Sequence, residues 1–501
     1  MKTFLGIDVG TSAVKATLVD ERGRVAGTAS ERQPLATPRP GWAEQRPQDW
    51  WSATAKAVRK ALRAARAPAA RVAAVGLSGQ MHSSVFLDGA GAVIRPALLW
   101  CDGRTTEQCR AITARVGEAQ LARWVGNPAL EGFTLPKVLW LREHEPAAWR
   151  RLAKVVLAKD YVRYRLTGAL ASEPSDASAT LMYDPAARRW SEPLLRALEL
   201  DASLLPDVGA STEVLGRVTR EAAKATGLAE GTPVVGGGAD NACGAVGVGL
   251  VAPGEAVASW GTSGTVLTPT AEPRVDPALR AHTFCHVVPD TWYLMGVMLT
   301  AGGAFAWFAR ELARDLQKDG RRDVALALDA EAARVAPGAD GLTFLPYLQG
   351  ERTPHRDAAA RGAFVGLSLA HGRAHLARAV VEGICFGLRD SLEIVRGLAP
   401  ALDRVLVTGG GAKSAFVRRL QADVYGLPVV RVNREEGPAY GAALLAAVGA
   451  GAFRDLASAC AKTLRRLPPE APNRARHDAY AAPYARFRAL YPALHALSPN
   501  A

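Results

Sequence analysis

The sequence predicts an α/β protein of two domains, and three observations carry that prediction. The chain has 501 residues, more than a single hydrophobic core usually supports. Apolar segments with the period of strands alternate with segments of helical period, which is typical of α/β layer folds. One strand-turn-strand pattern occurs around Gly10 and again around Gly261, half a chain later. We therefore expect an N-terminal domain over 1–251 and a C-terminal domain over 252–501.

The first of these patterns predicts a β-hairpin over 6–20. Apolar residues flank a turn made of Gly10, Thr11 and Ser12. Gly10 lacks a Cβ, so backbone N–H groups can approach an anion closely, and the two hydroxyls add donors. Asp8, at the end of the incoming strand, would then face a metal ion held by a bound phosphate. An ordinary turn has the same pattern.

The recurrence of this turn makes the functional interpretation stronger. Two such hairpins, one from each half, would face each other across a cleft and bind phosphates from two sides. The second turn consists of Gly261, Thr262 and Ser263.

Two more predicted strand ends in the first half carry polar residues. One strand ends just before Met81 and His82, and another leads through a glycine run to Asp240 and Asn241, before a small-residue helix over 242–251. Ligands of α/β sheets collect beyond the carboxyl ends of strands, so we expect these side chains to share one site. Alternatively, Asp240 caps the helix, and the histidine has a purely structural role.

The second half contains a comparable strand end. The strand over 404–408 runs into a turn with Gly410 and Gly411, and Lys413 follows where a helix begins. Ala412 stands where a P-loop requires glycine, so this turn is not a P-loop.

A helix near the end of the chain has a different signal. The segment over 437–447 consists mainly of glycine, alanine and leucine. Such small residues predict a helix that packs closely against a neighbouring element.

The composition limits the partners. A formal net charge of +13 could indicate an anionic partner, but no basic block is interleaved with aromatic residues, so we expect no nucleic-acid binding. The longest uncharged run, over 437–453, is short for a membrane span, so we expect no membrane association. The six cysteines have no metal-ligand spacing and predict reduced, mostly buried thiols in a cytoplasmic protein.

Together these segments resemble the FGGY family of carbohydrate kinases, within the actin-like ATPase superfamily. The two hairpins and the 409–411 turn are similar, in order, to the two phosphate segments and the adenosine segment of that family. The segments 133–141 and 362–382 resemble its two signatures. The resemblance covers 3–451 and implies two actin-like ATPase (ribonuclease H-like) domains with a central cleft.

The resemblance also implies a role for each candidate residue. Asp240 would be the catalytic base and would contact the sugar together with Met81, His82 and Asn241. Asp8 would hold Mg²⁺, through water, because Mg²⁺ keeps much of its hydration shell. ATP would be bound by residues of the three turns and by two lysines: Gly10, Thr11, Ser12, Lys15, Gly261, Thr262, Ser263, Gly410, Gly411 and Lys413. Lys15 is equally well interpreted as a solvated strand lysine.

Within the family, four segments resemble the xylulokinases. This resemblance implies ATP-dependent phosphorylation of D-xylulose at its C5 hydroxyl. Cys101 and Phe416 depart from the expected pattern. The four segments that resemble the xylulokinases are 79–82, 99–104, 159–161 and 350–355.

Two alternatives remain at this point. The same chemistry could act on another ketopentose or on a pentitol, because one stereocentre changes few residues. The second alternative is a non-catalytic regulator that responds to sugar and ATP. The presence of both Asp8 and Asp240 argues against this alternative. We expect a homodimer that binds a small sugar and ATP.

Overall fold

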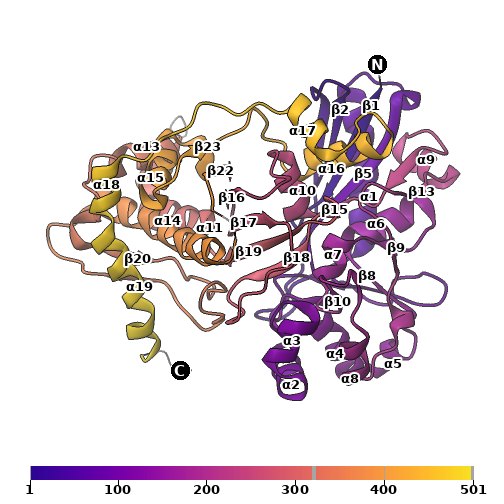
Figure 1. Ribbon diagram of the computed structural model, residues 1–501, viewed down its shortest axis with the longest axis horizontal. Coiled ribbons are helices and arrows are strands. Elements are labelled where there is room, and N and C mark those ends of the chain that lie inside the picture. The colour runs from indigo at the N-terminus through magenta and orange to yellow at the C-terminus, as the bar shows by residue number, and fades with distance from the viewer. Residues whose placement is uncertain (1, 319–322, 400, 498–501) are drawn as a thin grey trace.

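The structure, a computed structural model, describes residues 2–318, 323–399 and 401–497. Two large sheets, one in each half of the chain, organise these residues (Figure 1). The first sheet has the order β13-β14-β5-β1-β2-β3, and β15 also pairs with β5. Its strands are β1 (Thr3–Val9), β2 (Ala13–Asp20), β3 (Val25–Arg32), β5 (Val72–Gly79), β13 (Val214–Arg217), β14 (Pro233–Val235) and β15 (Gly238–Ala239).

The second sheet repeats the central arrangement of the first. Its order is β18-β19-β17-β16-β22-β23, so an antiparallel hairpin, β16-β17, again lies next to a parallel strand, β22. The strands are β16 (Glu255–Trp260), β17 (Gly264–Thr270), β18 (His282–Cys285), β19 (Trp292–Met298), β22 (Arg404–Gly409) and β23 (Val429–Val430).

The two predicted hairpins are confirmed. β1 pairs with β2 in antiparallel register from Thr3↔Asp20 to Val9↔Val14, around the turn at residues 10–12. β16 pairs with β17 from Val257↔Leu267 to Trp260↔Gly264, around the second turn. Both incoming strands also pair in parallel with a neighbour, and their apolar side chains are mostly buried, as expected for the centre of a covered sheet.

Helices cover the two sheets. In the first half they are α1 (Pro47–Ala64), α2 (Thr106–Val116), α3 (Glu118–Val125), α4 (Thr134–His144), α5 (Pro146–Trp149), α6 (Ala158–Thr167), α7 (Pro174–Ser178), α8 (Glu192–Ala197), α9 (Arg220–Thr226) and α10 (Asp240–Gly247). In the second half they are α11 (Gly302–Leu312), α12 (Arg314–Lys318), α13 (Val324–Ala332), α14 (Arg373–Leu398), α15 (Ala415–Tyr425), α16 (Pro438–Gly449), α17 (Leu456–Thr463), α18 (Arg474–Ala479) and α19 (Ala481–His495).

Shorter strand pairs lie outside the two large sheets. They are β4 (Glu44–Gln45) with β7 (Ala97–Leu98), β6 (Val85–Leu87) with β8 (Lys154–Val156), β9 (Ala171–Ser172) with β12 (Asp207–Val208), β10 (Tyr183–Asp184) with β11 (Arg189–Trp190), and β20 (Thr343–Leu345) with β21 (Ala363–Val365).

The helix expected over 242–251 was misplaced by a few residues. α10 already begins at Asp240 and ends at Gly247. The chain turns directly from β15 into the helix, so Asp240 is its first residue.

The small-residue helix α16 packs on the sheet of the other half. It lies against β1, β5 and α10, beside the first hairpin in Figure 1. The approach is close enough that a Cβ on Gly6 would lie 1.8 Å from the carbonyl oxygen of Ala439. The expected close packing is confirmed, and the chain's second half thereby contributes a layer to its first.

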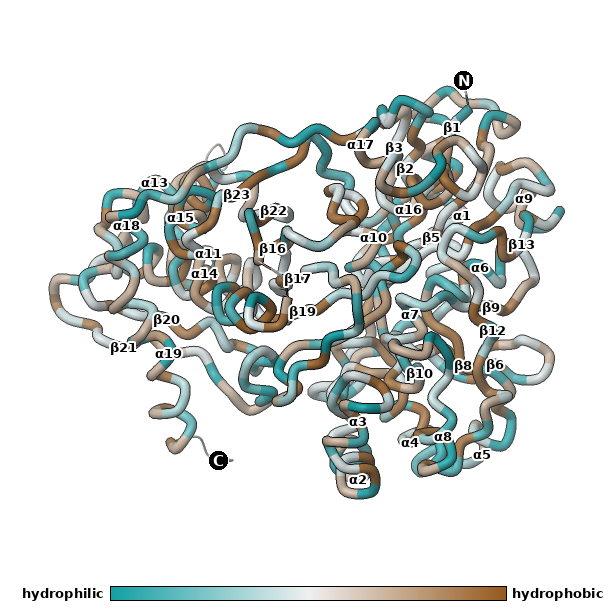
Figure 2. The backbone as a smooth tube through the Cα atoms, viewed as in Figure 1, coloured by the Kyte–Doolittle hydropathy of each residue, from teal (hydrophilic) through white to brown (hydrophobic). Residues whose placement is uncertain are grey.

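The apolar core only partly follows the same division. One set of buried side chains lies in the first half and another in the second, while a third set extends over both halves. Figure 2 shows the amphipathic character of the outer helices, since hydrophobic and hydrophilic residues lie on opposite sides of α2. Each of the six cysteines is a free thiol, and all except Cys101 are buried, as predicted. Among the described residues, no helix is both long and apolar enough to cross a bilayer.

Candidate active site

Three strands of the first sheet end at one edge and bring the predicted polar residues together. β5 lies between β1 and β15, and Gly79 is in register with both Val9 and Ala239. The residues that follow the three strands therefore lie close together: the Gly10 turn after β1, Met81 and His82 after β5, and Asp240 after β15. This is the arrangement expected of a ligand site in an α/β sheet.

Asp8 is a partly exposed carboxylate with one unsatisfied oxygen. Its Oδ1 atom is buried and has no hydrogen-bond partner. Burial raises the pKa of Asp8 to about 6, against the opposing effects of the neighbouring Ser78 hydroxyl and the charge of Lys15. A buried carboxylate oxygen without a donor is suited to bind a cation or a cation-bound water.

Asp240 lies close enough to Asp8 for the two charges to interact. Its Oδ1 accepts hydrogen bonds from the backbone N–H of Asn241 at 2.7 Å and from the Asn241 side chain at 3.0 Å. Burial, and then the negative charge of Asp8, raise the pKa of Asp240 to about 7. A carboxylate with such a pKa can accept a proton near neutral pH.

Met81 and Asn241 lie against each other beside this pair. The Asn241 Nδ2 atom is 3.4 Å from the Met81 sulfur. The hydroxyl of Thr265, on β17 of the second half, lies 3.5 Å from the Asn241 Oδ1 atom. The site is therefore in contact with both halves of the chain.

His82 is a neutral histidine held in a fixed orientation. Its backbone has a positive φ of 65°, and its Nδ1 lies 2.5 Å from the carbonyl oxygen of Ala179. Burial, and then the charges of Arg352 and Lys137, lower its pKa to about 3. Because a carbonyl only accepts, we assign the proton to Nδ1, which leaves Nε2 as an acceptor for a ligand hydroxyl.

The surroundings of His82 come from residues that the sequence did not single out. Lys137 Nζ and Thr134 Oγ1 each donate to the His82 carbonyl at 3.1 Å. The ring of Phe133 packs against the His82 ring with centroids 4.7 Å apart. All three belong to the segment 133–141, which the sequence identifies only as a family-like motif. A buried lysine within that apolar segment was the available signal.

The hydroxyl of the first turn is already engaged. Thr11 Oγ1 donates to the side-chain oxygen of Gln80 at 3.0 Å and accepts from the Trp100 ring nitrogen at 2.9 Å. Ser12 is exposed, and the Gly10 N–H donates to the Ala13 carbonyl at 3.1 Å. Trp100 is a second residue missed from sequence, although it lies in the family-like segment 99–104.

The second hairpin turn meets the glycine turn at the carboxyl edge of the second sheet. Trp260, just before Gly261, is in parallel register with Gly409. A Cβ on Gly411 would lie 2.5 Å from the Trp260 ring, so only glycine permits this contact. The partly exposed Gly261–Ser263 turn receives hydrogen bonds from backbone N–H groups at the start of α11.

The two predicted lysines lie farther from these strand ends. Lys15 stands opposite Asp8 on β2, and its Nζ donates to the Glu436 carbonyl at 3.1 Å, in the loop before α16. Lys413 is 70% exposed and lies 3.8 Å from the Glu435 carboxylate. Both lysines thus converge on the loop at Glu435 and Glu436, rather than on the two hairpin turns.

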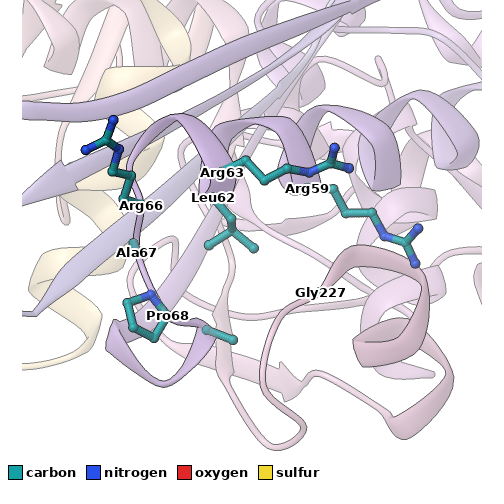
Figure 3. Close-up of a pocket in the computed structure, with 8 residues that line it drawn as sticks. Arg59, Leu62, Arg63, Arg66, Ala67, Pro68 and Gly227 are labelled. Carbon is teal, nitrogen blue, oxygen red and sulfur yellow. The ribbon is translucent and has the colours of Figure 1, made fainter.

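A separate cavity of about 570 Å³ lies at the end of α1 (Figure 3). Arg59, Arg63 and Arg66 line it together with small and apolar residues, and Arg66 points away from the other two. The cavity is next to the amino end of β5, at the opposite edge of the sheet from Asp8. It is not part of the candidate site.

Comparisons with known proteins agree with this geometry. Residues 3–247 match the N-terminal domain of the FGGY family of carbohydrate kinases, and residues 256–450 match its C-terminal domain. A xylulose kinase of Bacillus subtilis is 40% identical over 465 residues, 93% of this chain and 92% of that protein.

Solved structures share the fold over nearly the whole chain. A xylulose kinase from Rhodospirillum rubrum is 32% identical and has a TM-score of 0.89. The superposition covers 99% of this chain and 99% of that one. A gluconate kinase from Lactobacillus acidophilus, 27% identical, has a TM-score of 0.91, with 98% of each chain covered. The two-domain, actin-like ATPase fold is thereby confirmed, and it is shared by kinases with different sugar substrates.

Proposed function

The chain belongs to the FGGY family of carbohydrate kinases, and from that premise we propose that it transfers the γ-phosphoryl group of ATP to the C5 hydroxyl of D-xylulose. The observation that carries the proposal is the pair Asp8 and Asp240, whose strands flank β5 and end at the same edge. The similarity to xylulose kinases over more than nine-tenths of the chain supports the sugar assignment.

The proposed mechanism requires a base, charge compensation and in-line geometry. Asp240 accepts the proton of the sugar hydroxyl as that oxygen attacks the γ-phosphorus. Met81, His82 and Asn241 orient the sugar, with His82 Nε2 accepting from a hydroxyl. Closure of the two halves excludes water, which would otherwise compete for the phosphoryl group.

The nucleotide is bound by the remaining predicted residues. Backbone N–H groups of the two hairpin turns and the hydroxyls of Ser12, Thr262 and Ser263 contact phosphates, and the glycine turn after β22 contacts the adenosine. The two lysines contribute positive charge beside the loop at Glu435 and Glu436, which both contact. The proposed set is Gly10, Thr11, Ser12, Lys15, Gly261, Thr262, Ser263, Gly410, Gly411 and Lys413.

Magnesium fits the residues present. The described residues contain no cluster of three or more metal-ligating side chains, so a site made only of protein ligands is not expected among them. The free Oδ1 of Asp8 instead suits an ion that keeps most of its water and reaches the protein together with nucleotide phosphates. Such an ion would offset charge on the transferring phosphoryl group.

Three further properties belong to the proposal. We place the boundary between the domains at residues 251 and 252, between the two family matches. We also propose that the protein acts in the cytoplasm and as a homodimer. Size-exclusion chromatography with light scattering tests the dimer directly.

The experiment that tests the proposed function is an ADP-release assay with MgATP and a panel of sugars. The panel contains D-xylulose, L-xylulose, D-ribulose, L-ribulose, xylitol, D-arabinitol, D-gluconate and glycerol, with a blank without sugar. We expect the highest kcat/KM for D-xylulose. Preference for another sugar would retain the mechanism and change the substrate, and turnover independent of sugar would contradict the proposal.

The raised pKa of Asp240 predicts how the rate depends on pH. A base acts in its ionised form, and a pKa of about 7 means that protonation removes the base as pH falls through neutrality. We expect kcat/KM for the sugar to fall about tenfold per pH unit below that pKa. Initial rates between pH 5.5 and 9, in buffers of constant ionic strength, check this; a flat profile down to pH 5.5 would contradict it.

The contact between Gly411 and Trp260 predicts a selective effect on ATP. In Gly411→Ala the new methyl group meets the Trp260 ring and displaces the glycine turn. We expect KM for ATP to rise about tenfold and KM for the sugar to stay unchanged. A tenfold rise corresponds to a loss of about 1.4 kcal/mol of binding free energy. Gly372→Ala is the matched control, since a Cβ there meets nothing within 4 Å. Equal ATP kinetics in both variants would remove Gly411 from the nucleotide site.

A further inference from the structure

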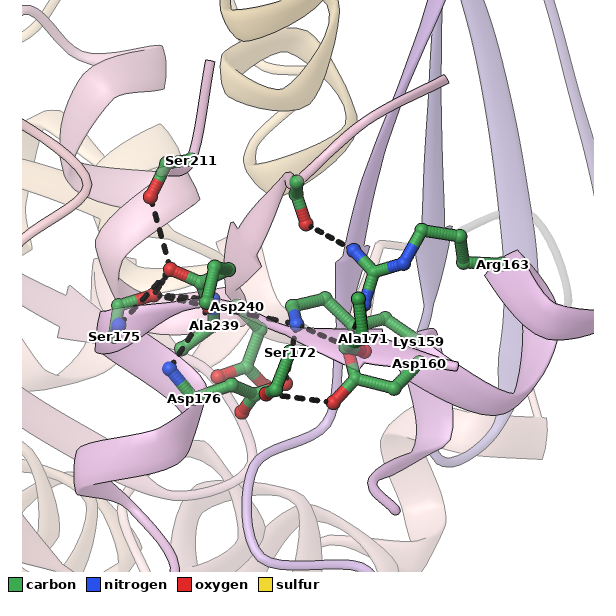
Figure 4. Close-up of polar contacts among 12 residues, drawn as sticks. Lys159, Asp160, Arg163, Ala171, Ser172, Ser175, Asp176, Ser211, Ala239 and Asp240 are labelled. Carbon is green, nitrogen blue, oxygen red and sulfur yellow. Dashed lines mark hydrogen bonds and ion pairs between the residues drawn. The ribbon is translucent and has the colours of Figure 1, made fainter. Parts of the chain in front are cut away.

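A buried ionic cluster lies beside β15, the strand that leads into Asp240 (Figure 4). It consists of Lys159, Asp160, Arg163, Glu173 and Asp176, whose side chains are at most 1% exposed. The Lys159 nitrogen is 2.7 Å from Asp160, 3.2 Å from Asp176 and 3.4 Å from Glu173. Arg163 is 2.5 Å from Asp160. The proposed mechanism uses none of these five side chains.

The charges in this ionic cluster can balance. Burial raises the pKa of Asp176 well above its ordinary value, which favours its neutral form. Burial opposes the charge on Lys159 as well, but the surrounding carboxyl groups, Asp160 foremost, raise its pKa overall. Two cations then face two carboxylates, Asp160 and Glu173. Burying such groups usually costs more free energy than their attraction returns, so stability alone is a weak reason for the cluster.

The cluster holds the backbone segment that leads to Asp240. Arg163 donates to the Gly236 carbonyl at 2.7 Å. The Ser211 hydroxyl donates to Glu173 at 2.9 Å, and the Ser211 carbonyl accepts from the Gly237 N–H at 2.8 Å. Both polar groups of the Gly236–Gly237 peptide, just before β15, are therefore attached to the cluster.

Ser175 makes the contact nearest to Asp240. Its hydroxyl oxygen accepts from the Ala239 N–H at 2.9 Å, one residue before Asp240. The same hydroxyl lies 2.8 Å from both carboxylate oxygens of Glu173. A carboxylate only accepts, so the Ser175 proton points to Glu173 and its lone pair points to Ala239. Glu173 thus sets the direction of the hydrogen bond that holds Ala239.

We propose that Ser175, oriented by Glu173 within the ionic cluster, is a positioning residue that holds Asp240 in line with the sugar hydroxyl. The proposal rests on the function proposed above, in which Asp240 is the base. Ser175 itself touches neither sugar nor nucleotide. Its effect reaches the reaction only through the position of the Gly238–Ala239 peptide group, which precedes Asp240.

The test compares Ser175→Ala with Ser178→Ala. Both serines are buried in α7, but the Ser178 hydroxyl donates to the Ser175 carbonyl and accepts from the Cys285 N–H, away from β15. Loss of helix stability would therefore affect both variants, and loss of Asp240 positioning only the first. Asp240→Ala is measured in parallel.

We expect Ser175→Ala to lower kcat about tenfold, because a small displacement of a catalytic group is costly. KM for ATP and for D-xylulose should change less than twofold. The acid limb of the pH–rate profile should move to lower pH, because a carboxylate released towards water is easier to ionise. Ser178→Ala should retain the kcat and the pH profile of the unmodified protein, with a melting temperature close to that of Ser175→Ala.

Equal kcat values and equal pH profiles for the two serine variants, with Asp240→Ala inactive, would overturn the positioning role alone. An active Asp240→Ala variant would instead refute the base assignment on which it rests. If Ser175→Ala does not fold, Ser211→Ala removes another donor to Glu173 and should shift kcat and the acid limb in the same directions; no shift in either quantity would overturn the proposal.

Discussion

Replacing Asp240 by alanine is expected to abolish phosphoryl transfer while leaving ATP binding nearly intact. Asp240 is the first residue of α10 and is close enough to Asp8 for their charges to interact, and its raised pKa suits a proton acceptor. Positioned general bases typically contribute about 10²–10⁴-fold to a rate, so kcat should fall by that factor or more. ADP release gives kcat, and isothermal titration with a non-hydrolysable ATP analogue and Mg²⁺ gives the affinity.

The control for this experiment is Asp207→Ala, which removes an exposed carboxylate from β12 in the same half of the chain. Its kcat should equal that of the unmodified protein. Near-normal turnover by Asp240→Ala would remove the base assignment. Loss of nucleotide affinity together with turnover would show that the substitution disturbs the fold.

Asp8→Asn is the second large effect expected. The substitution keeps the shape of the side chain but removes the charge that we propose faces the nucleotide-bound cation. We expect kcat to fall about 100-fold at ordinary Mg²⁺ concentration, equivalent to about 2.7 kcal/mol of transition-state stabilisation, with partial recovery as Mg²⁺ is raised. Steady-state rates over a Mg²⁺ titration at fixed, saturating ATP measure both quantities.

The same variant tests the coupling between the two aspartates. The charge of Asp8 raises the pKa of Asp240, so its removal should move the acid limb of the pH–rate profile to lower pH. Asp207→Asn serves as the isosteric control and should leave the limb in place. An unchanged Mg²⁺ dependence in Asp8→Asn would exclude the proposed metal role, whatever the loss of rate.

Much of the architecture could be predicted because it depends on local patterns. The period-two apolar segments on both sides of Gly10 and Gly261 are sufficient for two hairpins, and the structure contains both. Strand ends could also be located, which led us to expect Met81, His82, Asp240 and Asn241 in one site before any contact was known. Small residues around Ala439 predicted close packing, although not the partner.

The surroundings of the site depend on contacts between distant residues. Thr11 is hydrogen-bonded to Trp100, and Lys15 reaches the Glu436 carbonyl, 421 residues away along the chain. Neither contact leaves a trace in the local pattern, which specifies only the face of a strand on which a side chain lies. Lys137 is visible as a lysine within an apolar segment, but its contact with the His82 carbonyl is not.

The sequence by itself therefore determined which residues have the chemistry for phosphoryl transfer and at which strand ends they stand. Only the tertiary structure decided which of these side chains have an unengaged hydrogen-bonding group or a shifted pKa. Hydrogen bonds and burial depend on neighbours that packing brings together. Burial and the nearby charge of Asp8 raise the pKa of Asp240. Beside β15, the ionic cluster holds the Gly238–Ala239 peptide group, because the Ala239 N–H donates a hydrogen bond to Ser175.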